Sequence, residues 1–238
     1  MSIATEIERI QNAKTSIKNA IEEKGVEVGD GLIDTYADKI SEIIPHDTTL
    51  EDLLVTKRFS EEYTNNRIDR VGSQAFRETN ITKFNSTSVT YIAGYAFYYV
   101  DTLEECNAPN VTLCSGAGTF TSCTSLKKIE FPQNAGGINT SCFKGCTSLE
   151  YLNAGDATYI GSEAFADCSN LKTLIITKKN YLPSLSNVNA FSGSAIEAGT
   201  GYIYVSEELY NKYLTATNWT TYASQIKKIS ELQEGVEV

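Results

Sequence analysis

Apolar residues recur through the middle of the chain at intervals far longer than a helical turn. Six phenylalanines lie 21 to 26 residues apart, at Phe76, Phe97, Phe120, Phe143, Phe165 and Phe191. A leucine follows four of them by six residues, at Leu103, Leu126, Leu149 and Leu171. A unit of about 22 residues cannot bury its apolar side alone, so neighbouring units must stack. The pattern predicts a solenoid of about six repeats over residues 68–198.

Each repeat contains two segments with different patterns. The Leu-x-x-Ile/Leu segment, as in Leu126–Ile129, is short and extended, and stacked copies predict a parallel sheet with strands about 4.8 Å apart. The Gly-Ser-x-Ala-Phe segment, as in Gly161–Phe165, predicts a turn or short helical piece whose Phe fills the interior. Asn and Thr near these turns are expected to hydrogen-bond backbone groups between coils. With helices expected at both ends, the fold class is α+β.

The first 45 residues predict a helical module. Isoleucines form one stripe of a helix over residues 2–24, at Ile3, Ile7, Ile10, Ile17 and Ile21. A second helix is expected over residues 32–43. Either the two helices form a hairpin, or the stripe is a coiled-coil seam, where Ile at both core positions favours three or more chains, as in a homotrimer. Residues 1–45 would then anchor or oligomerise the protein, and residues 46–67 would form a linker or an N-terminal cap.

Residues 199–238 predict a C-terminal cap made of a strand and a helix. The strand is Tyr202–Val205, and Ser206 is expected to cap the helix that follows it. Trp219 and Tyr222 are expected to pack on the last repeat. The alternative for Trp219 is a platform for carbohydrate.

The cysteines follow the repeat. Cys123, Cys146 and Cys168 each lie three residues after a repeat Phe, and Val100 occupies the same place in the second repeat. A position that accepts Val or Cys is a small buried site, which favours buried thiols over disulfides. There is no Cys-x-x-Cys and no nearby histidine, so neither a metal site nor a cofactor is expected.

Composition narrows the function further. A formal net charge of −10 is a poor fit for nucleic acid or anionic membranes, and no apolar run is long enough to span a membrane. The N-terminus lacks a basic, apolar leader, so export by the general route is not expected. The single histidine, His46, makes a Ser-His-Asp triad improbable. The paired acids Glu104 and Glu105 would point to opposite faces of a strand, and we expect them to have surface roles. We therefore expect no enzyme activity and no catalytic residues.

Tyrosines are the better candidates for function, because Tyr gives contact area at low entropic cost. Six of the 14 lie at repeat positions that are not all interior, at Tyr91, Tyr95, Tyr98, Tyr99, Tyr151 and Tyr159. They form the candidate recognition surface. The alternative is that several of them fill the convex layer of the solenoid.

The repeat resembles that of BspA-like leucine-rich repeat proteins. The residues that carry this resemblance are Ile160-Gly-Ser-Glu-Ala-Phe165 to Leu171-Lys-Thr-Leu174 and Phe120-Thr-Ser-Cys-Thr-Ser-Leu126. The resemblance implies a leucine-rich-repeat solenoid used for adhesion or recognition, typically on bacterial surfaces. Residues 199–238 resemble the unit that often closes such arrays.

The N-terminal segment resembles short helical modules of Firmicutes phage and prophage structural proteins, on Ile10–Ile21 and Lys24–Ala37. This resemblance implies a tail-associated virion protein, made in the host cytoplasm, that binds a virion protein or the host surface through its repeats. The alternatives are a bacterial cell-surface adhesin of the BspA-like class and a carbohydrate-binding accessory domain, with a surface glycan as partner.

Overall fold

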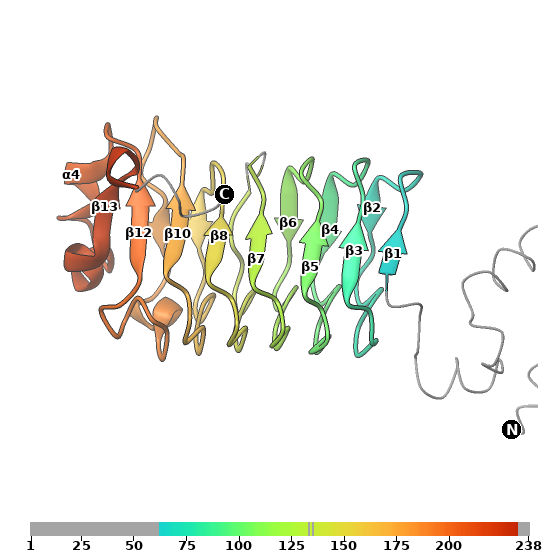
Figure 1. The fold of residues 1–238 in the computed structure, drawn as a ribbon. Coiled ribbons are helices and arrows are strands. Elements are labelled where there is room, and N and C mark those ends of the chain that lie inside the picture. Colours follow the sequence, from blue (N-terminus) through green and yellow to red (C-terminus); the bar gives the residue numbers. More distant parts are fainter. Residues whose placement is uncertain (1–61, 133, 135, 233–238) are drawn as a thin grey trace, which may run out of the picture. The chain divides into compact units, whose positions relative to one another are not determined.

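The computed structural model describes residues 62–132, 134 and 136–232, which belong to one of the two units into which the chain divides, residues 61–238. Figure 1 shows that this unit is a solenoid of about seven coils. The two helices predicted within the first 45 residues, with the stripe of Ile3, Ile7, Ile10, Ile17 and Ile21, lie outside the described residues.

One long parallel sheet runs along the solenoid. Its strands follow the order β1-β3-β5-β7-β8-β10-β12-β13. The bounds are β1 (Glu62–Thr64), β3 (Lys83–Asn85), β5 (Glu105–Asn107), β7 (Lys128–Glu130), β8 (Tyr151–Asn153), β10 (Thr173–Ile176), β12 (Tyr202–Val205) and β13 (Ile226–Lys228). The strand predicted in each Leu-x-x-Ile/Leu segment is confirmed. In β3, β5, β7 and β8 the central residue of the strand faces the interior, as Phe84, Cys106 and Ile129 do in three neighbouring coils.

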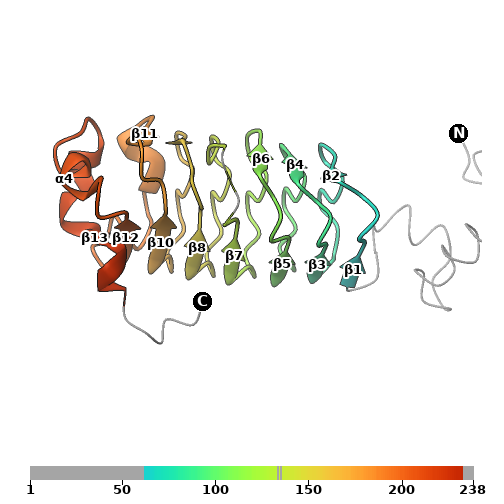
Figure 2. The ribbon, with the colours of Figure 1, turned by 90° about the horizontal axis from the view of Figure 1, so that it is seen from above.

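A second set of short strands lies on the other side of the coils, as Figure 2 shows, and the repeat pattern did not predict it. A three-stranded sheet contains β2 (Arg70–Val71), β4 (Tyr91–Ala93) and β6 (Leu113–Ser115), and a two-stranded sheet contains β9 (Tyr159–Ile160) and β11 (Ser184–Leu185). A single bridge joins Ile138 to Ile160. These strands end one or two residues before each Gly-Ser-x-Ala-Phe turn, so the coil is held on both sides.

The predicted Phe column is confirmed. Successive rings from Phe76 to Phe191 are stacked, with centroids 5.0–5.6 Å apart and interplanar angles of at most 5°. The leucine column is fully buried beside it, at Leu103, Leu126, Leu149 and Leu171. Burial of each large side chain stabilises the fold by about 1.5–3 kcal/mol, so the two columns supply much of its core.

The thiols are all free and buried, which agrees with the prediction. The Sγ atoms of Cys123, Cys146 and Cys168 each donate to the carbonyl of the Phe in the preceding coil, at 3.0–3.1 Å. Burial raises the pKa of these thiols, to about 12 for Cys168. They are therefore protonated hydrogen-bond donors within the core.

The C-terminal coil closes the end of the stack. Its helical pieces are α4 (Tyr210–Tyr213), η2 (Trp219–Gln225) and η3 (Ile229–Glu231), while η1 (Val188–Phe191) lies one coil earlier. Trp219 is buried and donates its Nε1 to Pro183 O at 2.8 Å, so it packs on the last repeat and cannot act as a carbohydrate platform. The prediction for Ser206 is wrong, because α4 begins later and the Ser206 hydroxyl donates to Lys178 O at 2.7 Å.

Candidate recognition surface

The turns that carry the repeat Phe have an unusual backbone that positions the side chains around it. In the first five coils, the residues two before and two after the Phe have positive φ, between 54° and 74°. This conformation turns alternate amides towards the next coil: Tyr95 N, Phe97 N and Tyr99 N donate to three carbonyls of that coil at 2.8–3.0 Å. An L residue in this region costs about 1–2 kcal/mol, which the hydrogen bonds between coils offset.

The second coil has a tyrosine at both of these positions. Tyr95 has φ 59° and Tyr99 has φ 57°. Glycine, which adopts this conformation without strain, occupies one of the two positions in the next coils, at Gly118 and Gly145. The two tyrosine side chains are 41% and 51% exposed. The chain therefore keeps two large exposed rings at positions where they gain little burial and strain the backbone.

Tyr98 joins these two rings in one cluster. Its ring meets Tyr95 edge to face at 5.5 Å and lies 4.6 Å from Tyr99, measured between centroids. The guanidinium of Arg77 lies 5.1 Å from the centre of the Tyr98 ring. Tyr98 is thus half-buried and supports the two outer rings, which are more exposed.

These three rings form one end of a cavity of about 440 Å³, which we name the tyrosine groove. It crosses four coils, and its lining residues are Tyr95, Tyr98, Tyr99, Ala117, Gly118, Thr121, Ser122, Thr140, Ser141, Lys144, Gly145 and Asp167. Gly118 lets the Tyr95 ring lie against the neighbouring coil, because a Cβ at Gly118 would be 2.7 Å from Tyr95 Cε1. Its volume is in the range of small-molecule sites.

Hydroxyl groups line the middle of the tyrosine groove. The Thr121 hydroxyl donates to Ser141 O at 2.6 Å. The hydroxyls of Ser122, Thr140 and Ser141 form no hydrogen bond with any other residue that the structure describes. A hydroxyl is both donor and acceptor, so these three can bind a ligand that has both kinds of group.

The far end of the tyrosine groove carries opposite charges. Lys144 Nζ lies 2.6 Å from Glu163 Oε2, and this hydrogen bond raises the pKa of Lys144. Asp167 is exposed nearby and forms no ion pair with a described cation. Because the lysine is already neutralised by Glu163, the groove has no excess of positive charge.

The six predicted tyrosines do not form one surface. Tyr91 and Tyr159 lie on the short strands β4 and β9, half-buried, with Arg70 4.7 Å from the centre of the Tyr91 ring and the Tyr159 hydroxyl donating to Asn139 Oδ1. Tyr151 is only 5% exposed and packs with other apolar side chains on the outside of β8. A ring as buried as this offers no open face, and its burial also raises the pKa of Tyr151 to about 12.

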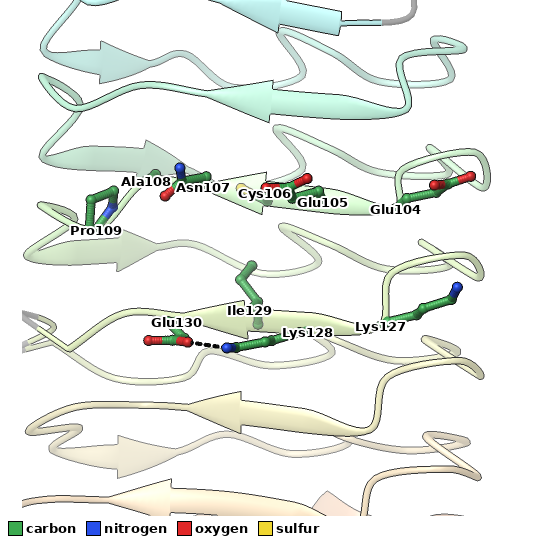
Figure 3. A pocket seen from close by; sticks show the side chains of 10 residues that line it. All are labelled: Glu104, Glu105, Cys106, Asn107, Ala108, Pro109, Lys127, Lys128, Ile129 and Glu130. Atoms are coloured by element: carbon green, nitrogen blue, oxygen red, sulfur yellow. Dashed lines mark ion pairs between the residues drawn. The ribbon is translucent and has the colours of Figure 1, made fainter. Parts of the chain in front are cut away.

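A second cavity, of about 490 Å³, lies on the long sheet, where β5 and β7 pair at two positions rather than three (Figure 3). Glu104 and Glu105 are both exposed and line it; Glu104 precedes β5, so the two acids are not neighbours within one strand as expected. Lys128 and Glu130 form an ion pair of 2.7 Å within it. Its charged groups therefore satisfy one another in part.

The backbone opens at the same place. In neighbouring coils the amide after the repeat Leu donates to the preceding coil, as Glu104 N does to Thr82 O at 2.8 Å. Among the described residues, Lys127 N makes no such bond. Cys106, beside this opening, is 4% exposed, whereas the other five cysteines are fully buried.

Sequence reasoning missed most of the tyrosine groove. It identified Tyr95, Tyr98 and Tyr99, but not the polar residues supplied by the next three coils, such as Ser141, Lys144 and Asp167. The sequence does contain a signal for these residues. When the repeats are aligned on their Phe, the residues two before and two after it form the column from which the groove is built. A hydrophobic pattern identifies interior positions, so it does not predict the side chains of this exposed column.

Neither a membrane-spanning helix nor a metal-binding cluster is found in the described part of the chain. No helix there has the length and apolar character that crossing a bilayer requires. No group of three or more His, Cys, Asp or Glu side chains is placed to hold a metal ion among the same residues.

Comparison with known proteins agrees with this architecture. No curated protein matches the chain. The family profile described as the BspA type leucine rich repeat region matches residues 65–197 in six copies. The matched segment contains the stacked Phe and Leu columns and covers more than half of the sequence, so the chain belongs to the BspA-type leucine-rich repeat family.

Proposed function

We propose that the solenoid is a non-enzymatic recognition domain that binds its ligand in the tyrosine groove. Leucine-rich repeat domains are typically non-catalytic binding domains, which supports the general assignment. The tyrosine groove is assigned as the binding site because the exposed rings of Tyr95 and Tyr99, held in left-handed backbone, line one end of this cavity.

The energetics of the two tyrosines support this assignment. Each residue costs about 1–2 kcal/mol of backbone strain, and an exposed ring returns little of it through burial. Because the other coils have the same backbone at these positions, the choice of Tyr in the second coil, rather than the strain, distinguishes the site. A tyrosine that served stability alone would be expected inside the coil, where Phe97 already fills the space.

The proposed setting is a bacterial cell surface, where the protein acts as an adhesin of the BspA-like class. The virion assignment expected from the sequence depended on residues 1–45, which lie outside the described residues, and no comparison supports it. The adhesin, which is the alternative given above, is supported by the match to the BspA-type repeat family. Both the location and the tyrosine groove as the binding site belong to this proposal.

A binding screen with the full chain tests the proposal. Labelled protein is applied to an array of extracellular matrix proteins, each with and without its glycans, and of bacterial and host glycans. We expect saturable binding to at least one component, lost when Tyr95 and Tyr99 are both replaced by Asn. Binding that survives this double substitution would exclude the tyrosine groove, and the absence of saturable binding at about 100 µM protein would contradict the function.

A further inference from the structure

We infer that the tyrosine groove takes a neutral, β-linked oligosaccharide of hexose units, laid along the solenoid axis. This inference rests on the proposed function and names the ligand class of the same site. It is carried by three features of the groove: exposed aromatic rings, hydroxyls without a partner among the described residues, and a spacing between coils that fits one sugar unit.

The aromatic faces come first. A hexose in its chair form presents axial C–H bonds on one face, and these carry a small positive charge that is attracted to the negative face of an aromatic ring. Tyr95 and Tyr99 are the two exposed rings of the cluster. Because Tyr98 packs against both rings and Gly118 lets Tyr95 lie against the next coil, the rings are held in place before a ligand arrives.

The polar lining fits the edge of a sugar. Sugar hydroxyls donate and accept hydrogen bonds, as do the hydroxyls of Ser122, Thr140 and Ser141, which have no partner in the part of the chain that the structure describes. Lys144 is neutralised by Glu163, and Asp167 is negative, so an acidic sugar would meet no unpaired cation in the groove. The ligand is therefore neutral.

The spacing decides the direction of the ligand. From the second coil to the fifth, successive Phe centroids are 5.0, 5.3 and 5.6 Å apart, and the groove residues advance with them, one coil at a time. Among β-linked hexose chains, the extended 1,4-linked chain, in which successive units alternate in face, advances by nearly the same length per unit. Successive sugar units would thus meet successive coils, beginning at the tyrosines and ending near Asp167.

A peptide fits this spacing less well. An extended peptide advances about 3.3 Å per residue, so its side chains face the same way about every 6.6 Å. Over three coils that period falls out of register with the groove. In addition, the column of hydroxyls offers no sheet edge to which a peptide backbone could add as a strand, because the amides of Tyr95, Phe97 and Tyr99 already donate to the next coil.

The test measures binding of the full chain to neutral β-linked oligosaccharides of glucose, mannose, galactose and N-acetylglucosamine, by saturation-transfer NMR and titration calorimetry. We expect binding to at least one series, with affinity rising with length up to about four units and then levelling, because four coils line the groove. Removal of one ring should lower the affinity roughly three- to tenfold.

The variants are chosen so that loss of binding is not loss of fold. Tyr95→Asn and Tyr99→Asn remove the rings but retain a residue that tolerates left-handed backbone. Gly145→Asn places a side chain on the groove floor at φ 74°, where the nearest contact of its Cβ would be Ser122 Oγ at 3.3 Å. The matched control is Gln74→Asn, at the position of Tyr95 in the preceding coil and outside the groove.

Three results would overturn the inference. One is the absence of saturation transfer to every neutral series at millimolar sugar. Another is equal binding by Gly145→Asn and the native chain, and a third is tighter binding of acidic oligosaccharides than of neutral ones. If the array shows instead binding of a deglycosylated protein that depends on Tyr95 and Tyr99, the proposed function stands and the sugar assignment fails.

Discussion

Two glycines at the same repeat position give a quantitative test of the stacking. Gly72 and Gly161 each lie four residues before the repeat Phe, and neither has positive φ. An ideal Cβ at Gly161 would lie 2.5 Å from Thr140 N and 2.7 Å from Asn139 C, both backbone atoms of the preceding coil. A Cβ at Gly72 would meet nothing within 4 Å in the part of the chain that the structure describes.

The expected magnitudes follow from these distances. A Cβ at 2.5 Å must move away by about 0.9 Å to reach ordinary contact, and both sides are backbone held by hydrogen bonds such as Gly161 N to Ile138 O at 2.8 Å. Overpacking of this kind costs about 1–3 kcal/mol, and loss of one hydrogen bond between coils adds about 1 kcal/mol. Gly161→Ala should therefore lower the free energy of unfolding by about 2–4 kcal/mol. Gly72→Ala should raise it by about 0.4–1 kcal/mol, because alanine restricts the unfolded chain.

Urea unfolding of the full chain measures the difference. Far-UV circular dichroism follows the whole solenoid, and the fluorescence of Trp219, the only tryptophan, follows the C-terminal coils against which it packs. We expect the two variants to move the midpoint in opposite directions. If Gly161→Ala is as stable as the native protein, or if both variants shift the midpoint equally, the coils are not stacked as closely as described.

Further predictions concern the core, the thiols and the cap. Phe120→Ala should lower the free energy of unfolding by about 3–5 kcal/mol, since its ring stacks between two others at 5.0 and 5.3 Å, whereas Phe120→Leu should cost less in the same urea assay. The thiols should resist Ellman's reagent at pH 8 until the chain unfolds, with Cys106 the first to react, and rapid reaction of several thiols in the native protein would contradict their burial. Hydrogen bonds from the Ser230 hydroxyl and amide lower the pKa of Glu207, so its contribution to stability is present above the unfolded pKa of about 4.3 and is lost as the pH falls through the lower folded value. Glu207→Gln should remove this part of the acid dependence in thermal melts between about pH 5 and 3, and an unchanged profile would refute it.

The interior of the fold could be predicted from the sequence because it repeats. Leu126 and Phe143 occupy positions that must be apolar in every coil, so their period fixes the register of the long sheet and the stacked rings. The hydrogen bonds between coils were also predictable in kind: Asn110 Nδ2 donates to Thr87 O at 2.7 Å. Each such position has the same physical requirement in every coil, either an apolar side chain or a side chain that forms a hydrogen bond, and the sequence repeats it.

The second line of strands and the turn backbone were not predictable in the same way. Arg70–Val71 forms a strand of two residues, too short to show alternation. The residue type does not indicate positive φ at Tyr99 or Ser122, because Tyr and Ser, unlike Gly and Asn, rarely adopt it. The positive φ is imposed by the next coil, whose carbonyls accept hydrogen bonds from the amides of the turn. Contacts between coils therefore decide the local conformation, and a motif within one coil does not reveal them.

The same backbone explains how one fold can carry different ligands. At the turn positions with positive φ, the main chain supplies the hydrogen bonds between coils, so the side chain contributes little to stacking. The position two before the Phe accordingly holds Gln74, Tyr95, Gly118, Ser141 and Glu163 in successive coils, with φ between 54° and 63° throughout. Stability thus depends on the interior columns, and recognition can depend on a column that the interior does not constrain. The repeat motif identifies the family for this reason, whereas the ligand must be inferred from the side chains that the motif leaves free.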